Sequence, residues 1–193
     1  NPSNTNLVVA FVESGDDGGA ATSVSMSDGF GGGTGSWTAM TTNPVGSGTK
    51  IWGFYKGLTA SPSGATVTAD PNGSQTTTLH VCVFSTTGGT PTWSVDGAQS
   101  SGTGTGTSLA ITTPASTIAT TSSSGVLLGF LWGDGCNSSA GSGFTIGSSS
   151  SNWATTDTEY RILTSASSYA VIGAANGCGS ESWMTLGIAF KAN

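Results

Sequence analysis

Carboxylates are the side chains with which this chain could carry out acid–base chemistry, since it holds ten acidic residues and a single histidine. Glycoside hydrolysis needs two carboxylates that face each other across a cleft. The candidates are Glu13, Asp157, Glu159 and Glu181, and Glu13 and Glu159 lie in or at the ends of expected strands, from which they could project on one face. The alternative is isolated, solvated carboxylates on outer strand faces, so we rank a glycoside hydrolase third among the functions considered.

His80 gives little support for nucleophilic catalysis, which needs a base beside a serine or cysteine. It is the only histidine, it lies in the apolar run 79–84, and no Gly-x-Ser-x-Gly turn occurs. We therefore expect a histidine packed within a strand, and a protein that is not an enzyme.

Asp16, Asp17 and Asp134 lie in corresponding Gly/Asp turns that follow two similar apolar runs. Hard cations bind clustered oxygen ligands, which aspartates and turn carbonyls supply. If the two turns face each other, the three aspartates could share a calcium ion, although their spacing is not that of an EF-hand. The alternative is aspartates that only form turns, and no other cofactor is expected.

Trp153 and Trp93 have polar flanks and are the tryptophans that we expect at the surface. An exposed indole offers a sugar a flat apolar face, and Asn152 beside Trp153 adds a hydrogen-bonding partner. These residues define a candidate glycan site, unless Trp153 turns back into the core. The other four tryptophans lie in strand patterns and are expected in the core: Trp37, Trp52, Trp132 and Trp183.

Cys136 and Cys178 both lie in Gly/Asn/Ser turns, and we expect them to form a disulfide that stabilises the fold by roughly 2–4 kcal/mol. The alternative is two free thiols. A zinc site has less support, because no Cys-x-x-Cys motif occurs and the one histidine is in a strand. Cys82 lies in an apolar run and is expected to be a small buried hydrophobe. A disulfide would indicate an extracellular protein.

Strands must position these residues, and two similar segments of the sequence, residues 6–18 and 125–135, indicate where the central strands lie. Each segment is an apolar run that leads into a Gly/Asp turn. We infer an internal duplication with copies at about residues 6–85 and 125–191, which close around one core as a single domain over residues 1–193. Residues 86–124 are predicted to form a connecting hairpin that lies over the sandwich, the alternative being a flexible linker.

Strand signals dominate, and no segment keeps the three-four apolar spacing of a helix. Gly, Ser and Thr number 31 each, whereas charged residues make up only 7% of the chain, so edge strands are poorly guarded. We predict an all-β, jelly-roll-like β-sandwich with almost no helix. Its strands are expected near residues 7–13, 22–27, 36–41, 49–56, 64–69, 77–85, 92–99, 106–112, 126–132, 143–147, 157–164, 168–174 and 182–191.

Charge and hydropathy exclude two classes of partner. With four basic residues and a pI near 4.2, the chain has almost nothing with which to neutralise phosphates, so we expect no nucleic acid and no anionic membrane surface. No run of eighteen apolar residues and no basic-then-apolar leader occurs, so we expect neither membrane insertion nor a signal peptide. A mature secreted product or a virion protein would have this composition.

Short motifs recur along nearly the whole chain. They are Leu-Val-Val-Ala (7–10), Gly-Ser-Trp-Thr (35–38), Lys-Ile-Trp (50–52), Ala-Thr-Val-Thr (65–68), Val-Leu-Leu-Gly (126–129), Gly-Ser-Gly-Phe (141–144), Glu-Tyr-Arg (159–161) and Ile-Ala-Phe-Lys (188–191). In this order they resemble the Gly/Ser/Thr-rich β-sandwich modules of bacterial secreted and surface proteins and of tailed-phage structural proteins. That resemblance implies a jelly-roll-like fold and a non-catalytic surface or structural role, and it carries over no active site.

The favoured hypothesis is a non-enzymatic extracellular or virion-surface structural protein, a building block of a coat, filament or decoration layer that associates with itself through β edges or sandwich faces. The second is a carbohydrate-binding module that uses exposed tryptophan. Asn72 and Asn137 fit the glycosylation acceptor pattern, which would suit an extracellular surface.

Overall fold

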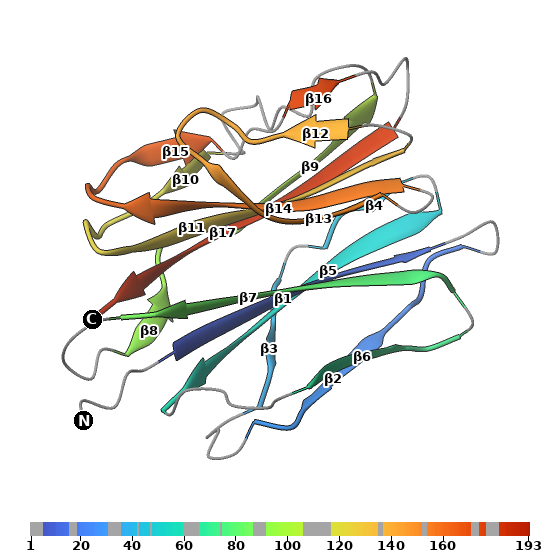
Figure 1. Ribbon diagram of the computed structural model, residues 1–193, viewed down its shortest axis with the longest axis horizontal. Coiled ribbons are helices and arrows are strands. Elements are labelled where there is room, and N and C mark those ends of the chain that lie inside the picture. The colour runs from blue at the N-terminus through green and yellow to red at the C-terminus, as the bar shows by residue number, and fades with distance from the viewer. Residues whose placement is uncertain are drawn as a thin grey trace.

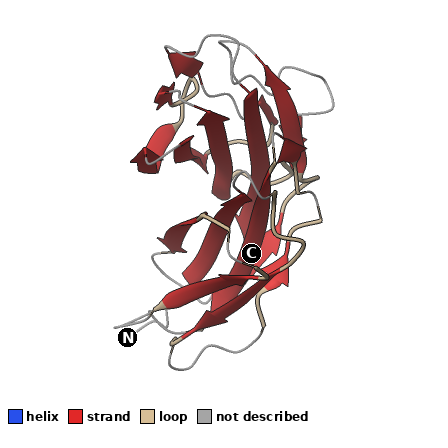
Figure 2. Ribbon diagram, turned by 90° about the vertical axis from the view of Figure 1, so that its right-hand side faces the viewer, coloured by secondary structure: helices blue, strands red, loops and turns tan. Residues whose placement is uncertain are grey.

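The apolar runs of the sequence form strands, and the part of the chain that the computed structural model describes contains no helix (Figure 2). It therefore contains no helix long and apolar enough to cross a membrane. The all-β prediction is confirmed. The described residues are 6–15, 19–30, 36–41, 43–46, 48–59, 66–73, 75–86, 92–105, 117–134, 137–151, 154–170, 174–176 and 182–193.

The first sheet is built around β1 (Asn6–Gly15), all ten residues of which are buried. Burial on both faces explains why this strand reads as a nearly continuous apolar run and not as an alternation. β1 pairs antiparallel with two long neighbours, one on each side. The sheet has the order β3 (Thr38–Ala39), β5 (Thr49–Leu58), β1, β7 (Thr77–Ser85), and β4 (Val45–Gly46) also pairs with β5.

The second sheet repeats this plan around β11 (Gly125–Asp134), which also has a long antiparallel neighbour on each side. Its order is β13 (Thr145–Ser151), β14 (Ala154–Leu163), β11, β17 (Ser182–Ala192), β8 (Trp93–Val95), with β9 (Ser100–Thr105) also on β17.

The two sheets pack face to face as a β-sandwich, with β1 over β11 (Figure 1). Phe11 stacks on Phe130 with ring centroids 5.3 Å apart, and both side chains are fully buried. On either side of this stack a tyrosine meets a phenylalanine edge to face. These flanking pairs are Tyr55 with Phe190 at 5.0 Å and Tyr160 with Phe84 at 5.7 Å.

Three two-stranded ribbons cover the outer faces of the sandwich (Figure 1). The first packs its apolar side chains on Ala10, Val12 and Phe54 of the first sheet, and a second cluster around Leu127 lies on the second sheet. Each sheet thus has an apolar cluster on its outer face as well as the shared core. The ribbons are β2 (Val24–Asp28) with β6 (Val67–Pro71), β10 (Thr117–Ala119) with β15 (Ser168–Ala170), and β12 (Asn137–Ser139) with β16 (Ala174–Asn176).

Pairing register relates the two halves of the chain. Val9 of β1 lies opposite Tyr55 and Cys82, and Leu128 of β11 lies opposite Tyr160 and Ile188. The two outer ribbons β2–β6 and β12–β16 also occupy the same places in the chain order of their halves. This correspondence supports an internal duplication, which stays an inference, as does the jelly-roll connectivity.

Two strands of the segment between the halves, β8 and β9, pair with the second sheet, and the hairpin expected over this segment stays a prediction. β8 and β9 both pair antiparallel with β17, so they run in the same direction along one edge and do not pair with each other. The strand predicted over 106–112 lies outside the described residues. Asp96 fixes the end of this segment, because its carboxylate accepts hydrogen bonds from the backbone N–H groups of Thr121 and Ser122 at 2.9–3.0 Å.

We expect Phe11→Ala and Phe130→Ala each to lower the free energy of unfolding by about 3–5 kcal/mol, since each removes one ring of the central stack and leaves a cavity. Urea unfolding followed by tryptophan fluorescence measures the change. Val45→Ala is the control, because Val45 is 59% exposed and its truncation should change stability by less than about 0.5 kcal/mol. A loss below about 1 kcal/mol for either phenylalanine variant would contradict the central role of the stack.

Candidate functional site

β7 forms one edge of the first sheet and crosses in front of β1 in Figure 1. Its register with β1 is uninterrupted over nine residues, and it contains no proline and no Asp, Glu, Lys or Arg. In an antiparallel ladder about half of the residues of an edge strand direct their N–H and C=O groups away from the sheet. Among the described residues no strand pairs with this outer side, so β7 presents an open row of backbone hydrogen-bonding groups.

Apolar side chains are exposed beside this edge. Val81 and Val83 alternate on the outer face of β7 and are 37% and 49% exposed. Ile162 of β14 is 57% exposed, because β13 begins at Thr145 opposite Tyr160 and does not extend along the last residues of β14. An exposed apolar cluster on a protein with so few charges is a candidate contact surface.

Two adjoining hollows of about 370 and 340 Å³ lie between the sheets at this edge, and Phe84 and Ile162 line both of them. We call the two hollows together the edge groove. The first is lined by Val81, Cys82, Val83, Phe84, Gly147, Ser148, Tyr160 and Ile162. The second is lined by Phe84, Ser85, Thr86, Trp93, Ser123, Ser124, Gly125, Val126, Ile162, Leu163 and Ala192.

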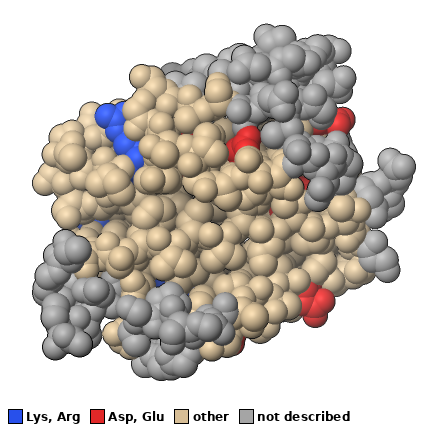
Figure 3. All heavy atoms as spheres, in the orientation of Figure 1, with Lys and Arg blue, Asp and Glu red and all other residues tan. Residues whose placement is uncertain are grey.

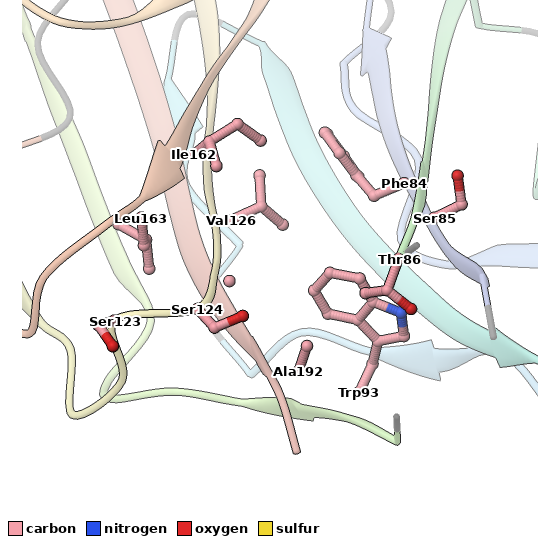
Figure 4. A pocket seen from close by; sticks show the side chains of 11 residues that line it. Phe84, Ser85, Thr86, Trp93, Ser123, Ser124, Val126, Ile162, Leu163 and Ala192 are labelled. Carbon is pink, nitrogen blue, oxygen red and sulfur yellow. The ribbon is translucent and has the colours of Figure 1, made fainter. Parts of the chain in front are cut away.

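Trp93 borders the second hollow together with Thr86 and the exposed serine Ser124 (Figure 4). The indole is half-buried, because part of it packs against the core, so it is less exposed than the sequence suggests. An aromatic face beside hydroxyl groups is an arrangement that suits a sugar ring. Trp153 and Asn152, the other predicted members of a glycan site, lie outside the described residues.

A network of hydroxyl groups around His80 lies beneath the groove. A hydrogen bond of 2.6 Å joins His80 Nδ1 to Ser148 Oγ, and one of 2.8 Å joins Nε2 to Thr156 Oγ1. The imidazole also meets Phe130 edge to face at 5.4 Å, and burial lowers the pKa of His80 to about 4. The expected packing of this histidine is confirmed. Both ring nitrogens are taken up by hydroxyl groups, with no carboxylate in either contact, so we assign the network a structural role.

The two carboxylates considered for glycoside hydrolysis are not brought together. Glu13 shares the inner face of β1 with Phe11, so it points between the sheets, where it is 1% exposed. Glu159 pairs with Gly129 on the outer face of the second sheet, and its Oε2 accepts a hydrogen bond of 2.8 Å from the backbone N–H of Gly141. One sheet therefore separates the two groups. Both are buried, contrary to the expectation of solvated carboxylates.

Burial also shifts the titration of these acids. It raises the pKa of Glu13 from its ordinary 4.5 to about 7, although hydrogen bonds from Thr78 oppose the shift. It raises the pKa of Asp157, on the outer face of the second sheet, to about 6. Glu181 lies outside the described residues.

Of the three proposed calcium ligands, Asp134 alone belongs to the described residues. Asp134 ends β11, and because β1 and β11 run in the same direction it lies at the same end of the sandwich as Gly15 (Figure 1). Asp16 and Asp17 follow Gly15 in the sequence and lie outside the described residues. Within the described part of the chain no three metal-ligating side chains come together, and the calcium site stays a prediction.

The predicted Cys136–Cys178 disulfide also lies outside the described residues. The backbone next to these cysteines is paired, however, since Asn137 of β12 lies opposite Asn176 of β16. The disulfide stays a prediction. Cys82 is a free, half-buried thiol that packs against the core, and burial raises its pKa.

Of the four tryptophans expected in the core, only Trp132 is fully buried. Trp37 and Trp52 are half-buried under the outer ribbon β2–β6, and Trp183 is half-buried over Gly104, where a side chain would collide with the indole. These indoles cover outer faces of the two sheets, which strand periodicity alone does not distinguish from the shared core.

All four basic side chains have electrostatic partners within the chain, which leaves little positive charge for an anionic ligand. The partners are Trp52 for Lys50 at 3.6 Å to the ring centre, Asp28 for Lys56 at 2.9 Å, Tyr169 for Arg161 at 4.8 Å to the ring centre, and Asp96 for Lys191.

Sequence reasoning missed Val81, Val83 and Ile162 as surface residues. Every residue from Leu79 to Phe84 except His80 is apolar, which reads as a strand covered on both faces. Only the order of strands in the sheet, which depends on pairing between distant segments, puts β7 at an edge. The low number of charged residues indicated that an edge strand would be unprotected, but it did not identify β7 as that strand.

Comparisons of the chain with family models, with curated protein sequences and with solved structures find no match. Function is therefore inferred from the geometry of the chain itself.

We expect Glu13→Gln to flatten the fall in stability between pH 4.5 and 7. In this range the folded protein keeps a proton on Glu13 that the unfolded chain has lost, so the free energy of unfolding falls as the pH rises. At pH 8 the variant should be more stable than the wild type by up to roughly 3 kcal/mol. Urea unfolding at pH 4.5 and at pH 8 measures this.

The difference between variant and wild type isolates Glu13. Asp157 acts in the same direction below about pH 6, whereas His80 acts in the opposite direction, with stability lost as the pH falls from 6.5 to about 4. Asp157 and His80 are present in both proteins, so their contributions to the pH dependence of stability cancel in the difference. Parallel pH profiles for the two proteins would show that Glu13 titrates normally.

Proposed function

We propose that this protein is a non-enzymatic structural protein of an extracellular or virion surface, a building block that associates with copies of itself through its β edges. The observation that carries the proposal is β7, a nine-residue edge strand without a charged residue, a proline or a bulge. Natural sheets usually protect such an edge with lysine, proline, bulges or a covering segment. An edge that lacks these devices suits a protein whose sheets are completed by another chain.

The surface around this edge supports the same function. In the face shown in Figure 3 charged side chains are few among the described residues. Val81, Val83 and Ile162 add exposed apolar area next to the open backbone groups. Backbone hydrogen bonds would give affinity, and the apolar side chains would exclude water from the contact.

Val83→Lys should weaken self-association by at least about tenfold, because each copy would then bring a lysine into the apolar contact, where its ammonium group must lose water. Size-exclusion chromatography with light scattering over a concentration series measures the association constant. Val45→Lys is the matched control, since Val45 is a 59% exposed valine on β4, at the other side of the first sheet. A wild-type protein that stays a monodisperse monomer at millimolar concentration would contradict the proposed function.

A second candidate function is carbohydrate binding in the edge groove. The half-buried indole of Trp93 borders a hollow of about 340 Å³ that is also lined by Ser85, Ser123 and Ser124 (Figure 4). The ring would stack on a sugar, and the hydroxyl groups would supply hydrogen bonds. A neutral glycan fits this hollow best, because none of its lining residues is charged.

If this second function holds, Trp93→Ala should reduce glycan binding more than tenfold, whereas Trp93→Phe, which keeps an aromatic face, should retain most of it. A glycan array identifies the ligand, and isothermal titration then compares the variants. An array without signal for the wild type would remove this candidate and leave the structural function untouched.

A further inference from the structure

We propose that β7 pairs with β7 of a second copy of this chain, antiparallel and in the register that puts a two-fold axis through Val81. The inference rests on the proposed self-association and names its interface. It would join the first sheets of two copies into one continuous sheet, in which each copy supplies β3, β5, β1 and β7 in mirrored order.

The choice of β7 follows from comparing the edges of the described strands. β13, the corresponding edge of the second sheet, has a register shift between Ile146 and Ser148 that would interrupt a new ladder. At the opposite sides, β3 and β4 are two residues long each, and β8 and β9 share β17 as two separate short strands. β7 is the longest unbroken edge that these strands offer.

The outer face of β7 is self-complementary about Val81. An antiparallel pair centred there places Val81 opposite its own copy and Leu79 opposite Val83 of the second copy, on the outer face. One step further out, Thr77 lies opposite Ser85, so a hydroxyl group meets a hydroxyl group. Matched apolar and hydroxyl pairs of this kind each stabilise a sheet by about 0.2–1 kcal/mol. On the inner face the same register places His80 opposite Cys82 and Thr78 opposite Phe84, so the symmetry of residue types belongs to the outer face alone.

Charge also favours pairing at this edge. Two copies that each carry a formal net charge of −6 repel each other, and the repulsion is smallest where no charged side chain approaches the contact. None of the residues of β7 is an Asp, Glu, Lys or Arg, and the buried His80 is neutral at pH 7 with a pKa of about 4. The groups that face His80 from the neighbouring elements are the hydroxyls of Ser148 and Thr156 and the ring of Phe130, which carry no charge either.

Disulfide trapping tests the strand and its register. Val81→Cys, in a Cys82→Val background, puts one thiol on the proposed axis, where the two Cα atoms of a facing pair lie within the range of about 4.4–6.8 Å that a disulfide needs. Val83→Cys in the same background is the matched control on the same strand. In this register its two copies are four residues out of step, about 13 Å apart along the strands, and cannot link.

Under mild oxidation we expect Val81→Cys to give at least about tenfold more covalent dimer than Val83→Cys, on non-reducing gels confirmed by mass spectrometry. Cys136 and Cys178 are common to both variants and do not affect the comparison. Thermal unfolding of each variant verifies that both are folded.

Equal trapping of the two variants, or more dimer from Val83→Cys, would overturn the two-fold register. If neither variant links while the wild type self-associates in solution, the contact uses another surface, so this inference fails and the proposed function stands. If the wild type is a monomer at every concentration, both fail together.

Discussion

The stacking of Phe11 on Phe130 joins the central strands of the two sheets, and the rest of the sandwich is arranged to keep both of these strands out of water. A strand that is apolar on both faces cannot be satisfied by one partner sheet. β1 therefore packs on β11 through its inner face and under the β2–β6 ribbon through its outer face. The same requirement on β11 places a second apolar cluster around Leu127. The layered architecture follows from burial of these two strands, at about 25 cal/mol per Å² of apolar surface.

The polar groups enclosed by this packing are held by hydroxyl groups more than by charges. His80 is contacted by Ser148 and Thr156, and Glu13 by Thr78. In the second half of the chain, Leu186 occupies the register position that corresponds to His80, and Trp132 occupies the position that corresponds to Glu13. The first sheet therefore contributes polar side chains to the core at two positions where the second sheet contributes apolar ones. A chain rich in serine and threonine can satisfy buried polar atoms without ion pairs, which cost more to desolvate. The one buried ion pair joins Lys56 to Asp28 among the described residues.

The long strands could be predicted from the sequence, because their apolar runs and Gly/Asp turns are local signals. Four of the strands missed, β4, β10, β12 and β16, are two or three residues long and too short to show a period. The fifth, β9, has six residues, but it consists of serine, threonine and glycine alone and so shows no apolar alternation. The burial of Glu13 was within reach, since it lies two residues after Phe11 on the same face of one strand. The separation of Glu13 from Glu159 and the edge position of β7 could not be predicted from the sequence, because both depend on which distant strands pair. The edge groove, which lies between the sheets beside β7, depends on that pairing too.

The way in which β11 is completed has a consequence for the order of folding. β17, its neighbour, also holds β8 and β9 in place, so strands from the middle of the chain have no partner until β17 has been synthesised. The inner face of β1 likewise stays unburied until β11 has been synthesised. Contacts between such distant segments form slowly, and the unpaired apolar strands of the nascent chain stay exposed during synthesis. The topology therefore delays the burial of β1, β8 and β9 until the last strand of the chain is available.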